Sequence, residues 1–139
     1  MAFAATRLSD VLSNFVLSSV IETWPVGEGT QDQSLYLNAV AIGDTELSPR
    51  ELLDALLAIE HAFGRQRPAR HAARTLDLDL ILSGDQVMVE KGLEVPHPRF
   101  RERFFVLGPL AEIAPDFVDP VSGMRVAELL RELLRDENR

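Results

Sequence analysis

The sequence predicts a protein that mixes helices and strands, and three observations lead to this expectation. Apolar residues recur at helical spacing after Ser48 and again over residues 124–137. A strictly alternating run extends over residues 74–82, as in a strand with one apolar face. The chain has 139 residues, which is long enough for one domain with a real hydrophobic core. We therefore expect a single domain over residues 1–139.

The first part of the chain predicts one short helix followed by two strands. Residues 4–12 place apolar side chains on one helical stripe, and a β-branched run over residues 15–23 then suggests a strand. A second strand is expected over residues 35–42, with Tyr36 and Asn38 on the same face. A buried Asn needs partners, so Asn38 either bonds backbone at a sheet edge or reads the polar edge of a heterocycle.

The next helix has clear signals at both ends. Ser48 and Glu51 have the spacing of a capping box, and Pro49 suits the first helical turn. Gly64 is expected to cap the C-terminus of this helix. The loop over residues 65–73 contains no apolar residue larger than Ala or Pro, so we expect it to become ordered only around an anionic ligand.

Beyond the alternating run, the sequence predicts a short strand and two more helical segments. The strand is expected over residues 86–89, after a turn containing glycine. Residues 95–98 should be rigid and extended, because each proline restricts the residue before it. Residues 104–110 predict a short helix or turn, and residues 124–137 predict an amphipathic helix whose apolar stripe belongs to the core or to an interface.

Composition and charge narrow the classes of function. The net charge of −8 argues against a general attraction to nucleic acid or to an anionic membrane. Eight of the fourteen Lys and Arg nevertheless lie between Arg65 and Arg103, and a basic island in an acidic protein suggests a small anionic ligand. The absence of Cys excludes disulfides and thiolate chemistry, and no run resembles a signal peptide or a membrane span. We therefore expect a cytoplasmic location.

The alternating run also carries the most informative polar residues. Its leucines form one face, and Asp77 and Asp79 lie side by side on the other. Two such carboxylates repel each other unless a cation lies near them, and oxygen ligands favour Mg²⁺, above all where a phosphate shares the ion. A bare pair of this kind is most often simply solvated. Here the ten residues before the run are crowded with basic groups, namely Arg65, Arg67, Arg70, His71 and Arg74.

Other common catalytic motifs do not occur in the sequence. There is no P-loop pattern, and no Cys–His, Ser–His or paired-His arrangement stands out. What remains is a set of carboxylates for metal, arginines for phosphate, and a Tyr, Asn and Phe set for a flat polar ring. Phosphoryl-type transfer uses those parts, because metals and cations neutralise charge as it develops on the phosphates.

The motif Arg74-Thr-Leu-Asp-Leu-Asp resembles the R-T-L-D-[LI]-D signature of the 6-hydroxymethyl-7,8-dihydropterin pyrophosphokinase family of folate synthesis. Further matches follow in the family's order, from about residue 8 to residue 130: Glu22 to Gly27, Tyr36 to Ala39, Ile59-Glu60 with Gly64-Arg65, Val95 to Pro98, and Pro109 to Pro115. The resemblance implies an α+β fold with a ferredoxin-like antiparallel sheet, helices packed on one face of it, and flexible catalytic loops.

The resemblance also implies transfer of the terminal pyrophosphoryl group of ATP to the hydroxymethyl oxygen of the pterin, with release of AMP. By matching position, Asp77 and Asp79 would hold two Mg²⁺ ions against the ATP phosphates, which Arg65 and Arg74 would grip. The ATP site would be lined by Glu60, Arg67, His97 and Arg103. The pterin pocket would be formed by Thr23, Val26, Tyr36, Asn38 and Phe105.

The chain departs from the family pattern near its beginning. The family opens with a strand and a Gly-Ser-Asn loop, and nothing of that kind precedes Ala4. Because that strand is central in a ferredoxin-like sheet, its absence would expose hydrogen-bonding groups and apolar faces of its neighbours. We therefore expect a homo-oligomer in which another subunit completes the sheet. The alternatives are that the remaining strands close up, or that the start of translation is assigned late.

The intact set of arginines and aspartates favours an active pyrophosphokinase. The alternative is a degenerate paralogue that binds nucleotide or pterin, or assembles with a partner, without turnover, and the missing strand motivates it. A metal nuclease built on the two aspartates is disfavoured by the acidic balance of the chain and by the lack of a nucleic-acid-binding face.

Overall fold

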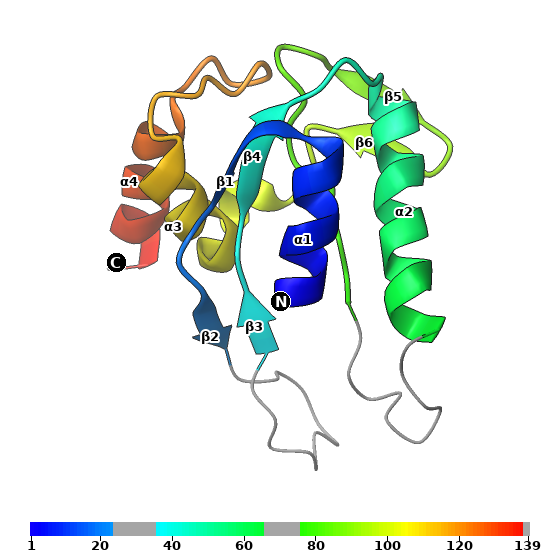
Figure 1. Ribbon diagram of the computed structural model, residues 1–139. Helices are drawn as coiled ribbons and strands as arrows, with labels where there is room; N and C mark the ends of the chain where they lie inside the picture. Colours follow the sequence, from blue (N-terminus) through cyan, green and yellow to red (C-terminus); the bar gives the residue numbers. More distant parts are fainter. Residues whose placement is uncertain (24–35, 66–75, 138–139) are drawn as a thin grey trace.

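The computed structural model describes residues 1–23, 36–65 and 76–137 (Figure 1). Its elements follow in the order α1 (Ala2–Val11), β1 (Ser13–Leu17), β2 (Ile21–Thr23), β3 (Tyr36–Asn38), β4 (Ala41–Asp44), α2 (Pro49–Arg65), β5 (Met88–Glu90), β6 (Leu93–Val95), the 3₁₀ turn η2 (Phe100–Glu102), α3 (Phe104–Ile113) and α4 (Val126–Glu137). Helices together with small antiparallel sheets confirm the α+β class. None of the described helices is both long and apolar enough to cross a bilayer.

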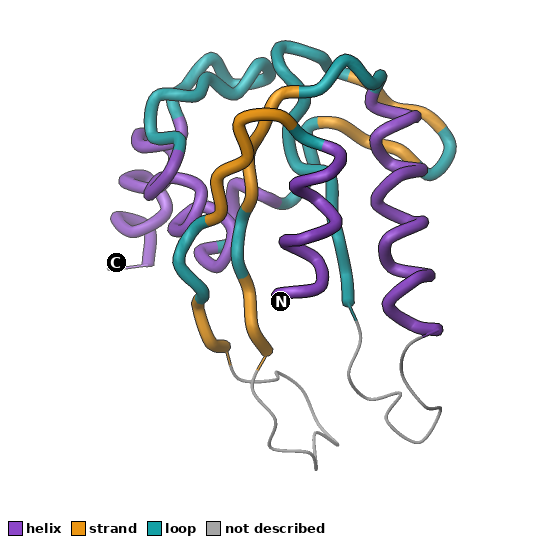
Figure 2. The backbone as a smooth tube through the Cα atoms, viewed as in Figure 1, coloured by secondary structure: helices purple, strands orange, loops and turns teal. Residues whose placement is uncertain are grey.

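Within the described residues the strands pair two by two, β1 with β4, β2 with β3, and β5 with β6 (Figure 2). The two longer strands expected over residues 15–23 and 35–42 are therefore each interrupted. At the break the Ser18 N–H donates to the Val40 carbonyl at 2.8 Å, and the Ser18 hydroxyl accepts from the Val40 N–H at 2.8 Å. The buried hydroxyl replaces a backbone acceptor, so the chains stay joined across the break.

Helices lie on both sides of the β1–β4 ladder (Figure 1). Leu8 of α1 forms one cluster with Leu56 and Ile59 of α2, and Ala41 packs against it. A second cluster joins η2, α3 and α4, and Ile42 packs against that one. Neighbouring residues of a strand point to opposite faces, which is why Ala41 and Ile42 contact different clusters. The α+β expectation thus needs one correction of detail, because the helices cover both faces of the ladder rather than one.

The ends of the helices agree only partly with the sequence signals. The capping box is confirmed, since the Ser48 N–H donates to Glu51 Oε1 at 2.9 Å and the Glu51 N–H donates to Ser48 Oγ at 3.2 Å. Gly64, however, does not cap α2, because the helix continues to Arg65. The glycines with a positive φ lie elsewhere among the described residues, so Gly64 does not use the left-handed conformation that a capping glycine provides.

The alternating run over residues 76–82 is placed as expected but is not a strand of any described ladder. Leu76, Leu78 and Leu80 pack against the cluster of α1 and α2, while Asp77 and Asp79 are exposed. Within the described part of the chain, its one backbone–backbone hydrogen bond is the 2.8 Å bond that the His97 N–H donates to the Ile81 carbonyl. The predicted alternation of faces is therefore confirmed, whereas a paired strand is not, because no described strand lies in register beside this segment.

A carboxylate on α2 accepts a backbone hydrogen bond from this segment, as the carbonyl of a neighbouring strand would do. Glu60 Oε2 accepts a 2.5 Å hydrogen bond from the backbone N–H of Leu78, the residue between the two aspartates. Glu60 is half-buried, and it lies on the face of α2 that is turned toward residues 76–80. This bond fixes the backbone at the point where both carboxylates leave it.

We predict that Glu60→Ala speeds hydrogen exchange at the Leu78 amide by roughly tenfold or more, because a hydrogen bond to a charged group contributes about 1.5–3 kcal/mol. The measurement is amide exchange followed by NMR. The matched control is Asp54→Ala, which removes an exposed carboxylate from the same helix and should leave the Leu78 amide unchanged. Equal exchange at Leu78 in all three proteins would contradict the role given to Glu60.

Candidate functional site

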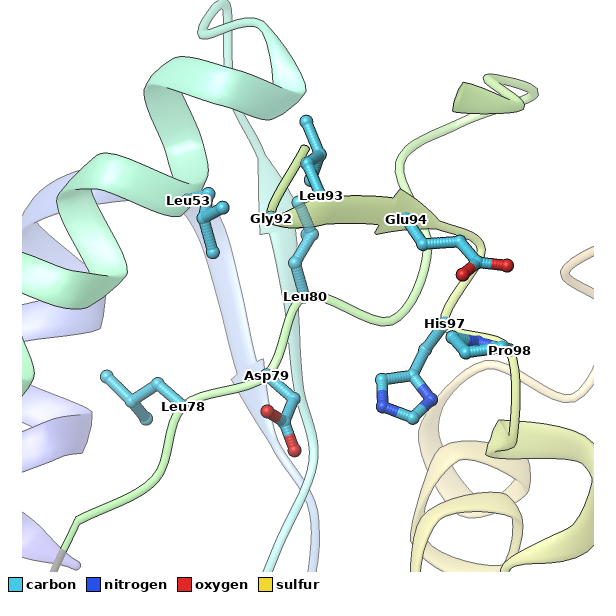
Figure 3. A pocket seen from close by; sticks show the side chains of 9 residues that line it. All are labelled: Leu53, Leu78, Asp79, Leu80, Gly92, Leu93, Glu94, His97 and Pro98. Atoms are coloured by element: carbon cyan, nitrogen blue, oxygen red, sulfur yellow. The ribbon is translucent and has the colours of Figure 1, made fainter. Parts of the chain in front are cut away.

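A pocket of about 190 Å³ lies beside the segment that carries the aspartates (Figure 3). Its apolar lining comes from Leu53 of α2, from Leu80, and from Leu93 of β6, together with Leu78 and Pro98. Its polar lining residues are Asp79, Glu94 and His97. Apolar walls with a few convergent polar groups are typical of small-molecule sites.

Asp79 and His97 face the same space from two different segments. Figure 3 shows the Asp79 carboxylate and the His97 ring extending toward the space between them, below Leu80 and β6. Asp77 is exposed on the same side of the chain as Asp79, because the leucines between and beside them turn inward. The described residues contain no group of three or more metal-ligating side chains. A pair of carboxylates nevertheless fits Mg²⁺, which usually completes its shell with substrate phosphates and water.

His97 is held in one tautomer by its own backbone neighbourhood. The ring Nδ1 accepts a 3.1 Å hydrogen bond from the Arg99 N–H, so the proton of the neutral ring resides on Nε2. Burial lowers the pKa of His97, and the nearby charges of Arg103 and Arg99 lower it further, while Asp79 and Glu94 act in the opposite direction. The net direction is downward, so near neutral pH His97 presents an uncharged Nε2–H donor.

The other residues expected at an ATP site fall into two groups. Arg103 is half-buried at the start of α3, close enough to influence His97, and its guanidinium carbon lies 5.8 Å from the centre of the Phe105 ring. Glu60 reaches the same place through its bond to Leu78. Arg65 is exposed at the last residue of α2. Arg67 and Arg74 lie outside the described residues.

The expected pterin residues lie on a different pair of strands. In the β2–β3 ladder Thr23 is opposite Tyr36 and Ile21 is opposite Asn38, which places Thr23, Tyr36 and Asn38 on one face. The Asn38 amide donates to Thr23 Oγ1 at 2.9 Å. Phe105 lies on α3, a helix that contacts β2, whereas Val26 lies outside the described residues. The structure thus groups three of the five expected residues on one face and places a fourth on an adjoining element.

The sequence did not reveal the pocket's own walls. Leu53 and Leu93 look like ordinary core residues of a helix and a strand, and Glu94 looks like a solvated strand residue. The one available signal was the proximity of Glu94 to His97 along the chain, and by itself it indicates nothing about a pocket.

Comparison with known proteins gives a family and several relatives. A family model described as 7,8-dihydro-6-hydroxymethylpterin-pyrophosphokinase (HPPK) matches residues 1–115. Three relatives share the name 2-amino-4-hydroxy-6-hydroxymethyldihydropteridine pyrophosphokinase. The one from Synechocystis sp. is 50% identical over 98 residues, which are 70% of this chain and 50% of the relative. The one from Haemophilus influenzae is 44% identical over 132 residues, 93% of this chain and 81% of the relative. The one from Pseudomonas aeruginosa is 49% identical over 102 residues, 73% of this chain and 62% of the relative.

The chain therefore spans about half the length of the Synechocystis relative and most of the Haemophilus one. All of the candidate site residues, from Thr23 to Phe105, fall inside the stretch that the family model matches. With this match over most of its length, the chain belongs to the 7,8-dihydro-6-hydroxymethylpterin-pyrophosphokinase family.

Proposed function

We propose that the protein transfers the terminal pyrophosphoryl group of ATP to the hydroxymethyl oxygen of 6-hydroxymethyl-7,8-dihydropterin and releases AMP, a step of folate biosynthesis. The observation that supports this most is the meeting of Asp79 and His97 at an apolar-walled pocket, with Glu60 and Arg103 beside them. Membership of the pyrophosphokinase family also supports this reaction class.

In this proposal the pocket takes the adenine ring and the triphosphate extends past Asp79. Leu53, Leu80 and Leu93 offer apolar surface to a flat ring, and Glu94 offers a carboxylate acceptor to an exocyclic amine. His97 then donates its Nε2–H to a phosphate oxygen. The arginines Arg65, Arg67, Arg74 and Arg103 supply positive charge around the phosphates.

Asp77 and Asp79 are the proposed ligands of Mg²⁺, with two ions in the complete site. When bound, the metal offsets the negative charge of the phosphates and polarises the group being transferred. Glu60 holds the Leu78 backbone, so the two carboxylates leave it in fixed directions and need little reorganisation when the nucleotide arrives.

The β2–β3 face is the proposed pterin site, completed by Val26 and Phe105. Asn38 uses one amide hydrogen on Thr23 Oγ1. Within the described residues the Asn38 carbonyl oxygen and the Thr23 hydroxyl hydrogen have no other partner, so in this proposal they pair with the polar edge of the ring. Tyr36 is 58% exposed, and its flat face is available for stacking on the ring. A site of this kind rejects rings that lack the matching polar groups.

Asp77→Asn and Asp79→Asn should each lower AMP formation by roughly a hundredfold or more, because each removes one charge from a site that stabilises developing phosphate charge. The measurement is a coupled AMP assay with 6-hydroxymethyl-7,8-dihydropterin, ATP and Mg²⁺. Asp85→Asn, in the exposed turn after the segment, is the control and should keep the wild-type rate. An unaffected rate in the Asp77 and Asp79 variants would refute the metal role. A wild-type protein that binds ATP but forms no AMP would indicate the non-catalytic alternative.

The pKa of His97 should lie below 6.5, and its neutral form should carry the proton on Nε2. Lowering the pH from 8 toward 5 and following the ¹⁵N shifts of the ring by NMR measures both properties. Since the pKa is depressed, the uncharged donor persists below pH 6.5, and the ring becomes protonated only at a lower pH. A ring that is already half protonated above pH 6.5, or that carries its proton on Nδ1, would exclude the proposed donor role.

We also infer a homo-oligomer in which a second copy covers the open edge of residues 76–82. Support comes from the backbone of this segment, which makes few hydrogen bonds within the described residues although its leucines are packed. Light scattering after size exclusion should give at least the mass of a dimer at assay concentration. A monomer whose amides over residues 76–80 are all protected from exchange would rule the oligomer out.

A further inference from the structure

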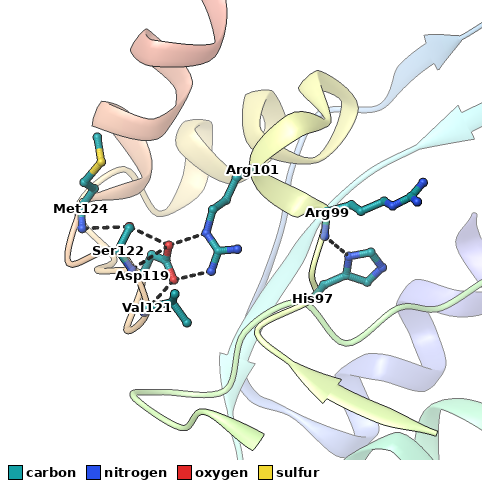
Figure 4. A network of polar contacts seen from close by, with 7 residues as sticks. All are labelled: His97, Arg99, Arg101, Asp119, Val121, Ser122 and Met124. Carbon is teal, nitrogen blue, oxygen red and sulfur yellow. Dashed lines mark hydrogen bonds and ion pairs between the residues drawn. The ribbon is translucent and has the colours of Figure 1, made fainter. Parts of the chain in front are cut away.

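A buried ion pair holds the turn that joins His97 to α3. Arg101, in η2, donates from Nε to Asp119 Oδ2 at 2.6 Å and from Nη2 to Asp119 Oδ1 at 2.9 Å (Figure 4). The Asp119 side chain is fully buried, and that of Arg101 is 25% exposed. A fork of two parallel hydrogen bonds restrains the orientation of a guanidinium as well as its distance.

Asp119 is fixed by its own loop as well as by Arg101. Its carboxylate accepts from the Val121 N–H at 3.1 Å, from the Ser122 hydroxyl at 2.7 Å, and from the Ser122 N–H at 3.4 Å. The loop is closed by the Asp119 N–H, which donates to the Met124 carbonyl at 2.8 Å. Burial by itself raises the pKa of Asp119, but the hydrogen bonds and the charge of Arg101 outweigh it and hold that pKa well below its usual range. The Asp119 carboxylate is therefore ionised, and can pair with Arg101, throughout the pH range in which an enzyme works.

The turn presents its basic residues in two directions. In Figure 4 Arg101 extends toward Asp119, whereas His97 and Arg99 leave the turn on the other side. The Arg101 guanidinium carbon also lies 4.6 Å from the centre of the buried Phe100 ring. A backbone hydrogen bond connects the residues on either side of Arg101, since the Arg103 N–H donates to the Phe100 carbonyl at 3.3 Å. The Glu102 N–H likewise donates to the Arg99 carbonyl at 3.1 Å, so Arg101 lies within a closed turn that also contains Arg99 and Arg103.

We propose that the Arg101–Asp119 pair is a positioning element that sets how His97 and Arg103 face the nucleotide phosphates. The statement that these residues face nucleotide phosphates rests on the proposed function. The effect of the ion pair on the turn does not depend on ATP. Asp119 lies beyond residues 1–115, the stretch that the family model matches, so a loop outside that stretch orients candidate site residues within it. Arg101 and Asp119 are positioning residues, since neither reaches the pocket.

The kinetic test compares Asp119→Asn and Arg101→Lys with a matched control. Asp119→Asn removes the charge at nearly constant volume, and Arg101→Lys keeps the charge but loses the fork. The control Asp116→Asn breaks the exposed 3.0 Å pair with Arg125 in the same loop region, and among the described residues no hydrogen bond or ion pair joins the side chain of either residue to the turn. We expect Asp119→Asn to raise the KM for ATP by roughly tenfold to a hundredfold, because small misplacements of binding groups are costly. The KM for the pterin should stay within about twofold, since its expected residues lie mainly on β2 and β3.

All variants are assayed at a temperature where their melting curves show a folded protein. Arg101→Lys should lie between the wild type and Asp119→Asn, and Asp116→Asn should match the wild type. An Asp119→Asn protein with a lower melting temperature and unchanged KM values for ATP and the pterin would show that the pair only stabilises the fold. That result, or an equal increase of both KM values, would overturn the proposal.

A second readout uses the free protein and is independent of turnover. ¹⁵N spectra of the His97 ring should show a changed tautomer population in Asp119→Asn, because the Arg99 N–H to Nδ1 bond depends on the turn, and no change in Asp116→Asn. If the wild type forms no AMP, the proposed function fails, and the His97 spectra still decide the positioning role. Unchanged His97 signals in a folded Asp119→Asn protein would refute it. Should Asp119→Asn not fold, Arg101→Lys takes its place in both measurements.

Discussion

The packing of three alternating leucines against the cluster of α1 and α2 is the constraint on which the candidate site depends. With Leu76, Leu78 and Leu80 turned into that cluster, the residues between them must turn outward. Both aspartates are thereby presented on one side of the segment by the packing of their neighbours. The hydrophobic free energy that orders the segment is spread over three side chains, so it also fixes the register, because a slip by one residue would bury the carboxylates.

The same segment contacts both hydrophobic clusters of the molecule. Residues up to Leu80 pack on the cluster of α1 and α2, while Ile81 and Leu82 pack on the cluster of η2, α3 and α4. The His97 N–H bonds to the Ile81 carbonyl at this junction. The carboxylates therefore come from one packed layer and the histidine and Arg103 from the other, and a ligand that binds between them contacts both layers.

Local patterns in the sequence predicted much of this arrangement. Contacts between residues far apart in the chain were not predicted. The alternation around Asp77 and the capping box at Ser48 depend on neighbours within a few residues, and both are confirmed. The cap expected at Gly64 is wrong, because a glycine near a helix end only permits a left-handed turn and does not force one. Asp119 was not recognised, since its partner Arg101 lies 18 residues away and no local spacing connects them.

Helix α2 is connected both to the segment that carries the two aspartates and, at its C-terminal end, to a positively charged side chain of the proposed phosphate site. Glu60 is tied to the backbone between the aspartates, and Arg65 ends the same helix five residues later, about 7.5 Å along its axis. Glu60 and Arg65 therefore connect one rigid helix to the backbone between the aspartates and to a cationic group of the proposed phosphate site. Because both connections start from the same helix, the length of α2 between residues 60 and 65 sets the spacing between the anionic segment and the base of the Arg65 side chain.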